Sequence, residues 1–338
     1  MRRNILSAIT LAAIATFSSM SAMADAVFDF YKGNTIRFTI GAAPGGGYDL
    51  YSRTLAQHME AKIPGKPRVL IVNMPGSGGV KASNYVYNAA AKNGTTLLMP
   101  FWTHPIFQLI RPKGIKFDMN KMLWIGNMAE LNSAVTTLSS VATSIEDAKK
   151  KVIIMAASGK GSETYIFPKL LNALIGTKFK IVTGYRGARN MSIAMERNEA
   201  QGRGGSWQSW NTIRPQWIKD KTITVLAQAG LRRLDALPDV PLITELVKPE
   251  DRPVARLLSS PVTLARIVGF PPGVSRDKLD ALRKAFTATM RDPAFLRDAA
   301  KRKMDLAYVS GADVQRQIAD LMKTPKPILR QATKLLGY

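Results

Sequence analysis

Short apolar runs alternate with helix-like segments along most of the chain. Four times, an apolar run leads into a glycine-rich turn and then into a segment with helical spacing, at residues 36–63, 68–92, 152–175 and 180–200. Apolar strands that alternate with helices indicate buried, largely parallel sheets and therefore an α/β fold. Ligands of such folds bind beyond the carboxyl ends of the strands, which is where the four turns lie.

The remaining segments predict how the chain passes between domains. Residues 94–105 and 122–138 are strand-like, and the second run is long enough to cross from one domain to another. Residues 261–286 combine a strand, a Pro-Pro-Gly turn and an amphipathic helix, which we interpret as the return to the first domain. A helical ending, 310–336, is broken by proline and is expected to pack on the outside. The expected domains are 25–130 plus 262–338, and 131–261.

The first 24 residues have the layout of a secretory signal peptide. Arg2 and Arg3 precede a short apolar run that ends in Ala-Met-Ala, so we expect cleavage after Ala24, with an uncleaved anchor as the alternative. The remainder, 338 minus 24 or 314 residues, is enough for two domains. No other stretch approaches the roughly 18 apolar residues of a spanning helix. The sequence therefore predicts that the mature chain is soluble and exported.

The chain is strongly basic. Lysine and arginine outnumber aspartate and glutamate by 48 to 24, a net charge of +24 that favours anionic partners. The densest clusters, 146–151 and 298–305, lie beside acids in helix-like segments, and no basic stripe is interleaved with aromatic residues. We therefore predict no nucleic-acid partner. The absence of cysteine excludes disulfides, thiolate metal sites and cysteine nucleophiles.

The glycine-rich turns match no catalytic or nucleotide-binding motif. Residues 41–49 lack the Gly-Lys-Ser/Thr ending of a P-loop, and Gly161 stands where a hydroxyl would have to follow Lys160. The G-x-S-x-G and H-E-x-x-H motifs are absent. Only two histidines are available: His58 is predicted to lie in a helix, and His104 could line a cleft. We predict a binding protein with no catalytic residue, no metal and no cofactor.

A glycine-rich turn that enters a helix can hold a carboxylate. It presents free N–H groups at the positive end of the helix dipole, and glycine has no Cβ to block close approach. Tight strand–helix packing is the alternative explanation for a single turn, but four such turns in a basic, exported chain favour ligand binding. Asp49 is interpreted as a helix-start residue stabilised by the dipole rather than as a ligand contact.

Several motifs, in order, resemble the receptors of tripartite tricarboxylate transporters, the Bug (TctC-like) family. They are "FTIGAAPGGGYDLYSRTLAQHM", "VLIVNMPGSGGVKASNYVYNAAAKNGTTLLM", "SGKGSE", "YRGARN", "LPDVPLITEL" and "GFPPGVSRDKLDALRKAF". Each motif alone is weak, but the ordered set is specific and covers nearly the whole mature chain. The resemblance implies a type II, Venus-flytrap periplasmic binding protein, with two mostly parallel sheets and a hinge.

The resemblance also implies a set of ligand-binding residues, carried over by position. Members of the family hold a carboxyl group mainly through backbone amides of a loop from each domain, often with bridging waters. The first domain contributes Ala43, Pro44, Gly45, Gly46, Gly47, Asn73, Gly78, Trp102 and Thr103. The second contributes Ser158, Gly159, Lys160, Gly161, Ser162, Tyr185, Arg186, Gly187, Gly205, Ser206 and Trp207.

Two departures from the family pattern bear on the ligand. Tyr165 stands where many members have a histidine, and "QGRGGSW", residues 201–207, stands where many have an aspartate. An acid there could receive the ammonium group of an amino acid. Its absence, with Arg203 and Trp207 nearby, argues for a non-amino carboxylate with an apolar or aromatic body. Packing is the alternative role for Trp207.

We therefore expect a monomeric periplasmic receptor that captures a small organic acid and presents it to a membrane transporter. The expected ligand is a di-, tri- or aromatic carboxylate, and the expected partners are inner-membrane permease subunits. A receptor that passes its signal to a membrane kinase is one alternative. An exported α/β enzyme that acts on an anionic substrate is another, although two histidines and no cysteine leave little to build its site from.

Overall fold

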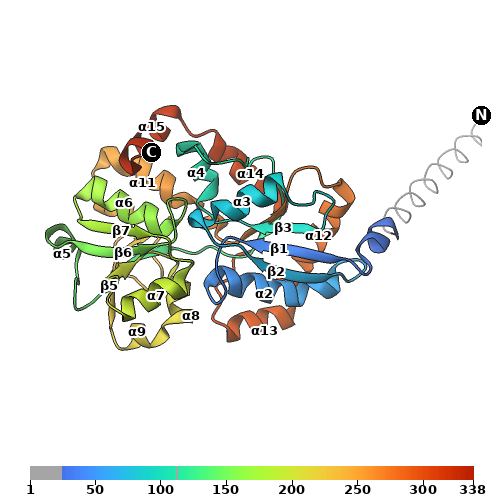
Figure 1. The fold of residues 1–338 in the computed structure, drawn as a ribbon, viewed down its shortest axis with the longest axis horizontal. Coiled ribbons are helices and arrows are strands. Elements are labelled where there is room, and N and C mark those ends of the chain that lie inside the picture. The colour runs from blue at the N-terminus through green and yellow to red at the C-terminus, as the bar shows by residue number, and fades with distance from the viewer. Residues whose placement is uncertain (1–24, 112) are drawn as a thin grey trace, which may run out of the picture.

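Two β-sheets, each covered by helices, lie side by side in the molecule (Figure 1). The computed structural model describes residues 25–111 and 113–338, so the predicted signal peptide lies outside the described residues. No described helix combines the length and apolarity that crossing a bilayer requires. The two-domain α/β fold predicted from the sequence is confirmed.

The first sheet has six strands in the order β11-β4-β10-β3-β1-β2. Strand β1 pairs in parallel with β2 and β3, whereas β10 runs antiparallel to β3 and β4, and β11 runs antiparallel to β4. The strands are β1 (Thr35–Ile40), β2 (Arg68–Asn73), β3 (Thr96–Met99), β4 (Leu123–Asn127), β10 (Ile267–Phe270) and β11 (Val309–Ser310).

The second sheet has five strands in the order β7-β6-β8-β5-β9. Strand β6 pairs in parallel with β7 and β8, and β5 runs antiparallel to β8 and β9. The strands are β5 (Ser133–Leu138), β6 (Ile153–Ala157), β7 (Phe179–Thr183), β8 (Gly202–Arg203) and β9 (Ile223–Ala229).

Both sheets are mixed, which differs from the mostly parallel sheets expected from the sequence. The four predicted strand–turn–helix units are present and supply the parallel pairs. The antiparallel pairs come from β5 and β10, the strands that follow the crossings between sheets, and from the short β11. A strand that enters a sheet from its neighbour is not constrained by a helical crossover, so it can run in either direction.

Helices cover both sheets, and several begin where a strand has just ended. They are α2 (Gly47–Met59), α3 (Val80–Asn88), α4 (His104–Ile110), α5 (Ile145–Lys150), α6 (Glu163–Ile175), α7 (Ala188–Glu196), α8 (Trp207–Ile213), α9 (Pro215–Lys219), α10 (Ile243–Leu246), α11 (Arg252–Ser259), α12 (Arg276–Met290), α13 (Pro293–Lys301), α14 (Gly311–Met322) and α15 (Lys326–Leu336). Residues 25–31 form a further helix at the start of the described chain.

The chain crosses between the sheets twice. The run that was predicted to cross splits into β4 in the first sheet and β5 in the second, joined by residues 128–132. The return runs from β9 to β10 through residues 230–266. Helix α15 then packs against both α4 and α6, so the end of the chain touches both halves of the molecule. The exact domain boundaries given above stay a prediction.

Candidate functional site

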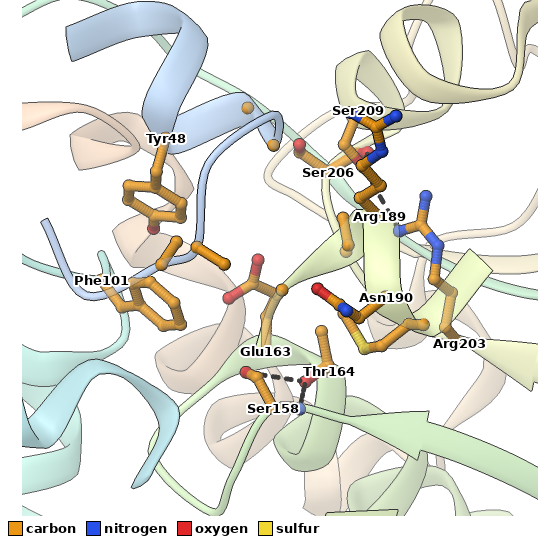
Figure 2. A pocket seen from close by; sticks show the side chains of 18 of the residues that line it. Tyr48, Phe101, Ser158, Glu163, Thr164, Arg189, Asn190, Arg203, Ser206 and Ser209 are labelled. Atoms are coloured by element: carbon orange, nitrogen blue, oxygen red, sulfur yellow. Dashed lines mark hydrogen bonds between the residues drawn. The ribbon is translucent and has the colours of Figure 1, made fainter. Parts of the chain in front are cut away.

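A small cavity lies between the two halves, beyond the carboxyl ends of β1, β6 and β7. Residues 42–44 and 46–48, with Phe101 and Arg266, line it from the first half, and parts of 158–164, 187–191 and 203–209 line it from the second. About 40 Å³ of the cavity is open to water-sized molecules, which is room for roughly three waters. In Figure 2 the labelled side chains of both halves converge on this space.

Three helices begin at the cavity. Helix α2 starts at Gly47, α6 at Glu163 and α7 at Ala188, and all three residues line the cavity. The first-turn N–H groups of a helix lack intrahelical partners and carry a partial positive charge. The convergence of three helix starts therefore favours an anionic group in this space.

Asp49 supports the first glycine turn from within α2. Its Oδ2 accepts hydrogen bonds from the Gly45 N–H and from Arg53 Nε, both at 2.9 Å, and its Oδ1 accepts from Asn73 Nδ2 at 2.9 Å. Burial raises the pKa of Asp49, but these bonds outweigh it and hold the pKa below its ordinary value. The Gly45 amide is thus engaged by Asp49, and the Ala43 amide donates to the Arg186 carbonyl at 2.9 Å.

Other predicted residues join the two halves beside the cavity. Thr103 Oγ1 donates to the Gly161 carbonyl at 2.6 Å. The turns at Gly78 and Gly159 touch so closely that a Cβ on Gly159 would lie 2.3 Å from the Gly78 nitrogen. Glycine is required here because any side chain would separate the two turns. These residues form an interdomain contact.

His104 supports that contact from behind. Its ring is completely buried, with Nε2 at 2.9 Å from the Gly78 carbonyl and Nδ1 at 2.9 Å from Ser83 Oγ. Burial lowers the pKa of His104 to about 4, so the ring is neutral at pH 7. The carbonyl can only accept, so we assign the proton to Nε2. His58 pairs instead with Asp298 at 3.0 Å, away from the cavity.

Glu163 points its carboxylate into the middle of the cavity (Figure 2). Its side chain belongs to the first residue of α6, and the residue is 6% exposed. Its Oε2 has no hydrogen-bond partner among the described residues. Burial raises the pKa of Glu163, and the charges of Arg266 and Arg203 only partly oppose this.

Arg203 is completely buried on the wall formed by the second half. Its guanidinium stacks on Trp210, 3.6 Å from the ring centroid, and Nε donates to Ser192 Oγ at 3.2 Å. Its Nη1 donates to Ser209 Oγ at 3.3 Å, while Nη2 has no partner in the described chain. Burial lowers the pKa of Arg203 to about 9, so the group remains cationic at neutral pH.

Arg266 reaches the cavity from the segment that returns to the first sheet. It is 2% exposed and lies over Tyr48, with its guanidinium carbon 4.1 Å from the ring centroid. Its Nη1 donates to the Ala265 carbonyl at 2.7 Å, and its Nε has no partner in the described part of the molecule. Its Nη2 lies next to the start of α2, 3.0 Å from where a Cβ on Gly47 would be.

The cavity brings together some of the residues that the sequence singled out. The predicted residues that line it are Ala43, Pro44, Gly46, Gly47, Ser158, Gly187, Gly205 and Ser206. The predicted residues that do not line it are Gly45, Asn73, Gly78, Trp102, Thr103, Gly159, Lys160, Gly161, Ser162, Tyr185, Arg186 and Trp207. Trp207 packs in the apolar core of the second half, and Tyr165 stacks on Tyr338.

Sequence reasoning missed most of the side-chain chemistry of the cavity. It placed Arg203 near the site but did not select Tyr48, Phe101, Glu163, Thr164, Arg189, Asn190, Met191, Ser209 and Arg266. Two signals were available. Glu163 follows directly on a predicted binding loop, and Arg266 is a lone charge inside the apolar run "VTLARIVGF". A charge within an apolar run is buried, and buried charges concentrate at functional sites.

Comparisons with known proteins agree with this architecture. The model of the "Tripartite tricarboxylate transporter family receptor" (TctC) matches residues 52–334. The periplasmic binding protein BugD superposes with a TM-score of 0.71 at 17% identity, covering 91% of this chain and 99% of that chain. MatC from Rhodopseudomonas palustris, solved with bound malate, superposes with a TM-score of 0.69 at 15% identity, covering 89% and 99%.

A third similar structure is R. palustris Rpa4515 with adipate, at a TM-score of 0.68 and 16% identity, covering 90% of this chain and 97% of that chain. No curated protein matches the chain. The fold and the cavity between its halves define a two-domain solute-binding protein. The family model spans most of the sequence, and the chain belongs to the tripartite tricarboxylate transporter receptors, the TctC family.

Proposed function

We propose that the protein is a periplasmic receptor that holds a small organic carboxylate between its two halves and delivers it to a membrane permease of the tripartite tricarboxylate type. One observation carries the proposal. Two buried arginines, Arg203 and Arg266, line the cavity, and each has a nitrogen without a hydrogen-bond partner in the described chain. A carboxylate is the small group whose charge and acceptors complement both.

The energetics favour binding at this place. A buried polar group without a partner destabilises the protein, so a ligand that satisfies it recovers that free energy. Each charge-assisted hydrogen bond contributes about 1.5–3 kcal/mol, and the three helix starts add to the attraction. Three or four such bonds support affinities near the micromolar range, once the free-energy cost of ordering the ligand and the side chains is subtracted.

Capture requires the two halves to separate and close again. The cavity has room for only a few waters, so an organic acid enters when the halves are apart. A bound acid that contacts both halves stabilises the closed form in proportion to its preference for that form. The similar structures of MatC with bound malate and of Rpa4515 with adipate support the choice of a carboxylate.

Calorimetric titration with mono-, di-, tricarboxylic and aromatic acids tests the binding step. We expect at least one acid to bind the wild-type protein, and Arg203→Lys and Arg266→Lys to weaken it about ten-fold or more. Lysine keeps the charge but cannot present the same fork of N–H groups. Arg276→Lys is the control, because Arg276 is exposed and pairs with Asp280. A wild-type protein that binds none of these acids contradicts the proposal.

Uptake measurements test the delivery step. A strain that lacks the gene should lose uptake of the acid that the purified protein binds, and the wild-type gene should restore it. The same gene carrying Arg203→Lys should restore it only at higher external concentrations. Undiminished uptake in the deletion strain argues against a transport role for this receptor.

A further inference from the structure

Three buried ionisable side chains face the cavity and are held apart from one another. Glu163, Arg203 and Arg266 each have an atom without a hydrogen-bond partner in the described chain: Oε2, Nη2 and Nε. No ion pair within 4.0 Å joins Glu163 to either arginine in the part of the chain that the structure describes. Figure 2 shows the carboxylate of Glu163 in the middle of the labelled side chains, with the Arg203 side chain to its right.

This arrangement is unfavourable for the protein alone. A buried charge without a partner destabilises the fold, and a buried ion pair would relieve that cost for both members. The side chains are instead held in place by their neighbours. Arg203 is fixed by Ser192, Ser209 and the face of Trp210, and Arg266 is fixed against the rings of Tyr48 and Tyr51. The residues around the cavity therefore keep the three side chains apart.

A complementary ligand needs groups of both signs. Negatively charged hydrogen-bond acceptors complement the arginines, and a hydrogen-bond donor complements the free Oε2 of Glu163. A plain carboxylate offers only acceptors: an ionised Glu163 repels it, and it can approach only when this side chain takes up a proton. A hydroxyl group could also donate to Oε2, but an ammonium group offers three donors and adds the attraction of an opposite charge.

We propose that the ligand is a small carboxylic acid that carries an amino group, with its carboxylate toward the arginines and its ammonium group on Glu163. This inference rests on the proposed function, because it takes the same cavity as the ligand site. It also replaces the expectation of a non-amino ligand. That expectation assumed no acid in the site, whereas the start of α6 supplies Glu163 from a different loop.

Matched pairs of probes test the proposal by calorimetry. Each pair differs by one amino group: succinate and aspartate, glutarate and glutamate, propionate and alanine, phenylpropionate and phenylalanine. In the pair that binds best, we expect the wild-type protein to bind the amino acid at least about ten-fold more tightly. Glu163→Gln should reduce that preference to a few-fold, because a neutral amide leaves the ammonium group without a charged partner.

Glu146→Gln is the matched control, because Glu146 also lies in the first turn of a helix but is exposed and pairs with Lys149. It should leave the preference unchanged. If Glu163→Gln does not fold, judged by thermal unfolding, the wild-type comparison decides alone. Equal or tighter binding of the acids that lack the amino group overturns this inference and leaves the proposed function standing. Binding of neither member of any pair, nor of any acid in the wider panel, contradicts the proposed function itself.

Discussion

The residues around the cavity divide into those that face it and those that hold them in place. Glu163, Arg203 and Arg266 face the cavity with unsatisfied atoms, whereas Asp49 and His104 are fully engaged by the protein. Asp49 uses its charge to hold a glycine turn. His104 also holds a glycine turn, through the Gly78 carbonyl. It does so as a neutral ring, because burial lowers its pKa.

His104 makes stability depend on pH. In the unfolded chain, the His104 ring binds a proton below its ordinary pKa of 6.5. In the folded protein, the same ring binds a proton only below about pH 4. Stability from the neutral ring is therefore complete above pH 6.5 and is lost as the pH falls from 6.5 to 4. Between pH 7 and pH 5 the loss is about 2 kcal/mol in the free energy of unfolding.

Urea denaturation at both pH values measures this loss. His104→Gln should remove most of it, because glutamine can still donate to the Gly78 carbonyl but does not titrate. His58→Gln serves as the control, since His58 lies elsewhere and its replacement should leave the His104 contribution in place. An acid-induced loss as large in His104→Gln as in the wild-type protein would show that another group is responsible.

At the scale of elements, the four glycine-rich turns have separate tasks. The turns before α2 and α7 line the cavity, whereas the turn before α3 and part of the turn before α6 meet each other across the halves. The sequence pattern alone does not distinguish these tasks. A glycine that admits a ligand and a glycine that admits another backbone have the same requirement, which is the absence of a Cβ.

Gly159→Ala tests the contact between the turns. The added methyl group would lie 2.3 Å from the Gly78 nitrogen, so the halves could not close fully. We expect the affinity for the best-binding acid to fall about ten-fold or more, in line with 1–3 kcal/mol of overpacking. Gly184→Ala is the control: its φ is also positive, at +115°, but a Cβ there meets nothing within 4 Å. An equal loss of affinity in both variants would mean that backbone strain, and not the contact between the turns, causes the loss.

At the scale of the whole molecule, the end of the chain adds a second link between the halves. Helix α15 lies over α4 and α6 (Figure 1). The Tyr338 hydroxyl donates to the Lys160 carbonyl at 2.8 Å, and its ring packs against Phe107 and Tyr165. Phe107 belongs to the first half, and Tyr165 and Lys160 belong to the second. Tyr338 therefore joins the two halves from outside the cavity.

Tyr338→Phe removes only the hydroxyl group of this link. Loss of one hydrogen bond, about 1 kcal/mol, should weaken ligand binding about five-fold by destabilising the closed form. Tyr308→Phe is the control, because its hydroxyl bonds to Thr287 away from the interdomain contact. Small-angle scattering of the ligand-bound protein should show a larger mean size for Tyr338→Phe. An unchanged affinity would mean that this bond does not favour the closed form.

Local patterns determined much of the fold. The four strand–turn–helix units, the crossing at residues 122–138 and the return near residue 267 all follow from apolar runs and glycine turns, which act over a few residues. The direction of β5 and β10 does not follow from them. A buried strand has the same apolar sequence whether its neighbour is parallel or antiparallel.

By itself, the sequence determined the α/β class, the two halves, the family and some of the loops that line the cavity. Only the tertiary structure decided which side chains share that space. Glu163, Arg203 and Arg266 lie far apart along the chain and come from three different segments, and packing of the two halves brings them to one cavity. Their burial, and the absence of an ion pair among these described residues, depends on distances in space that no local pattern encodes.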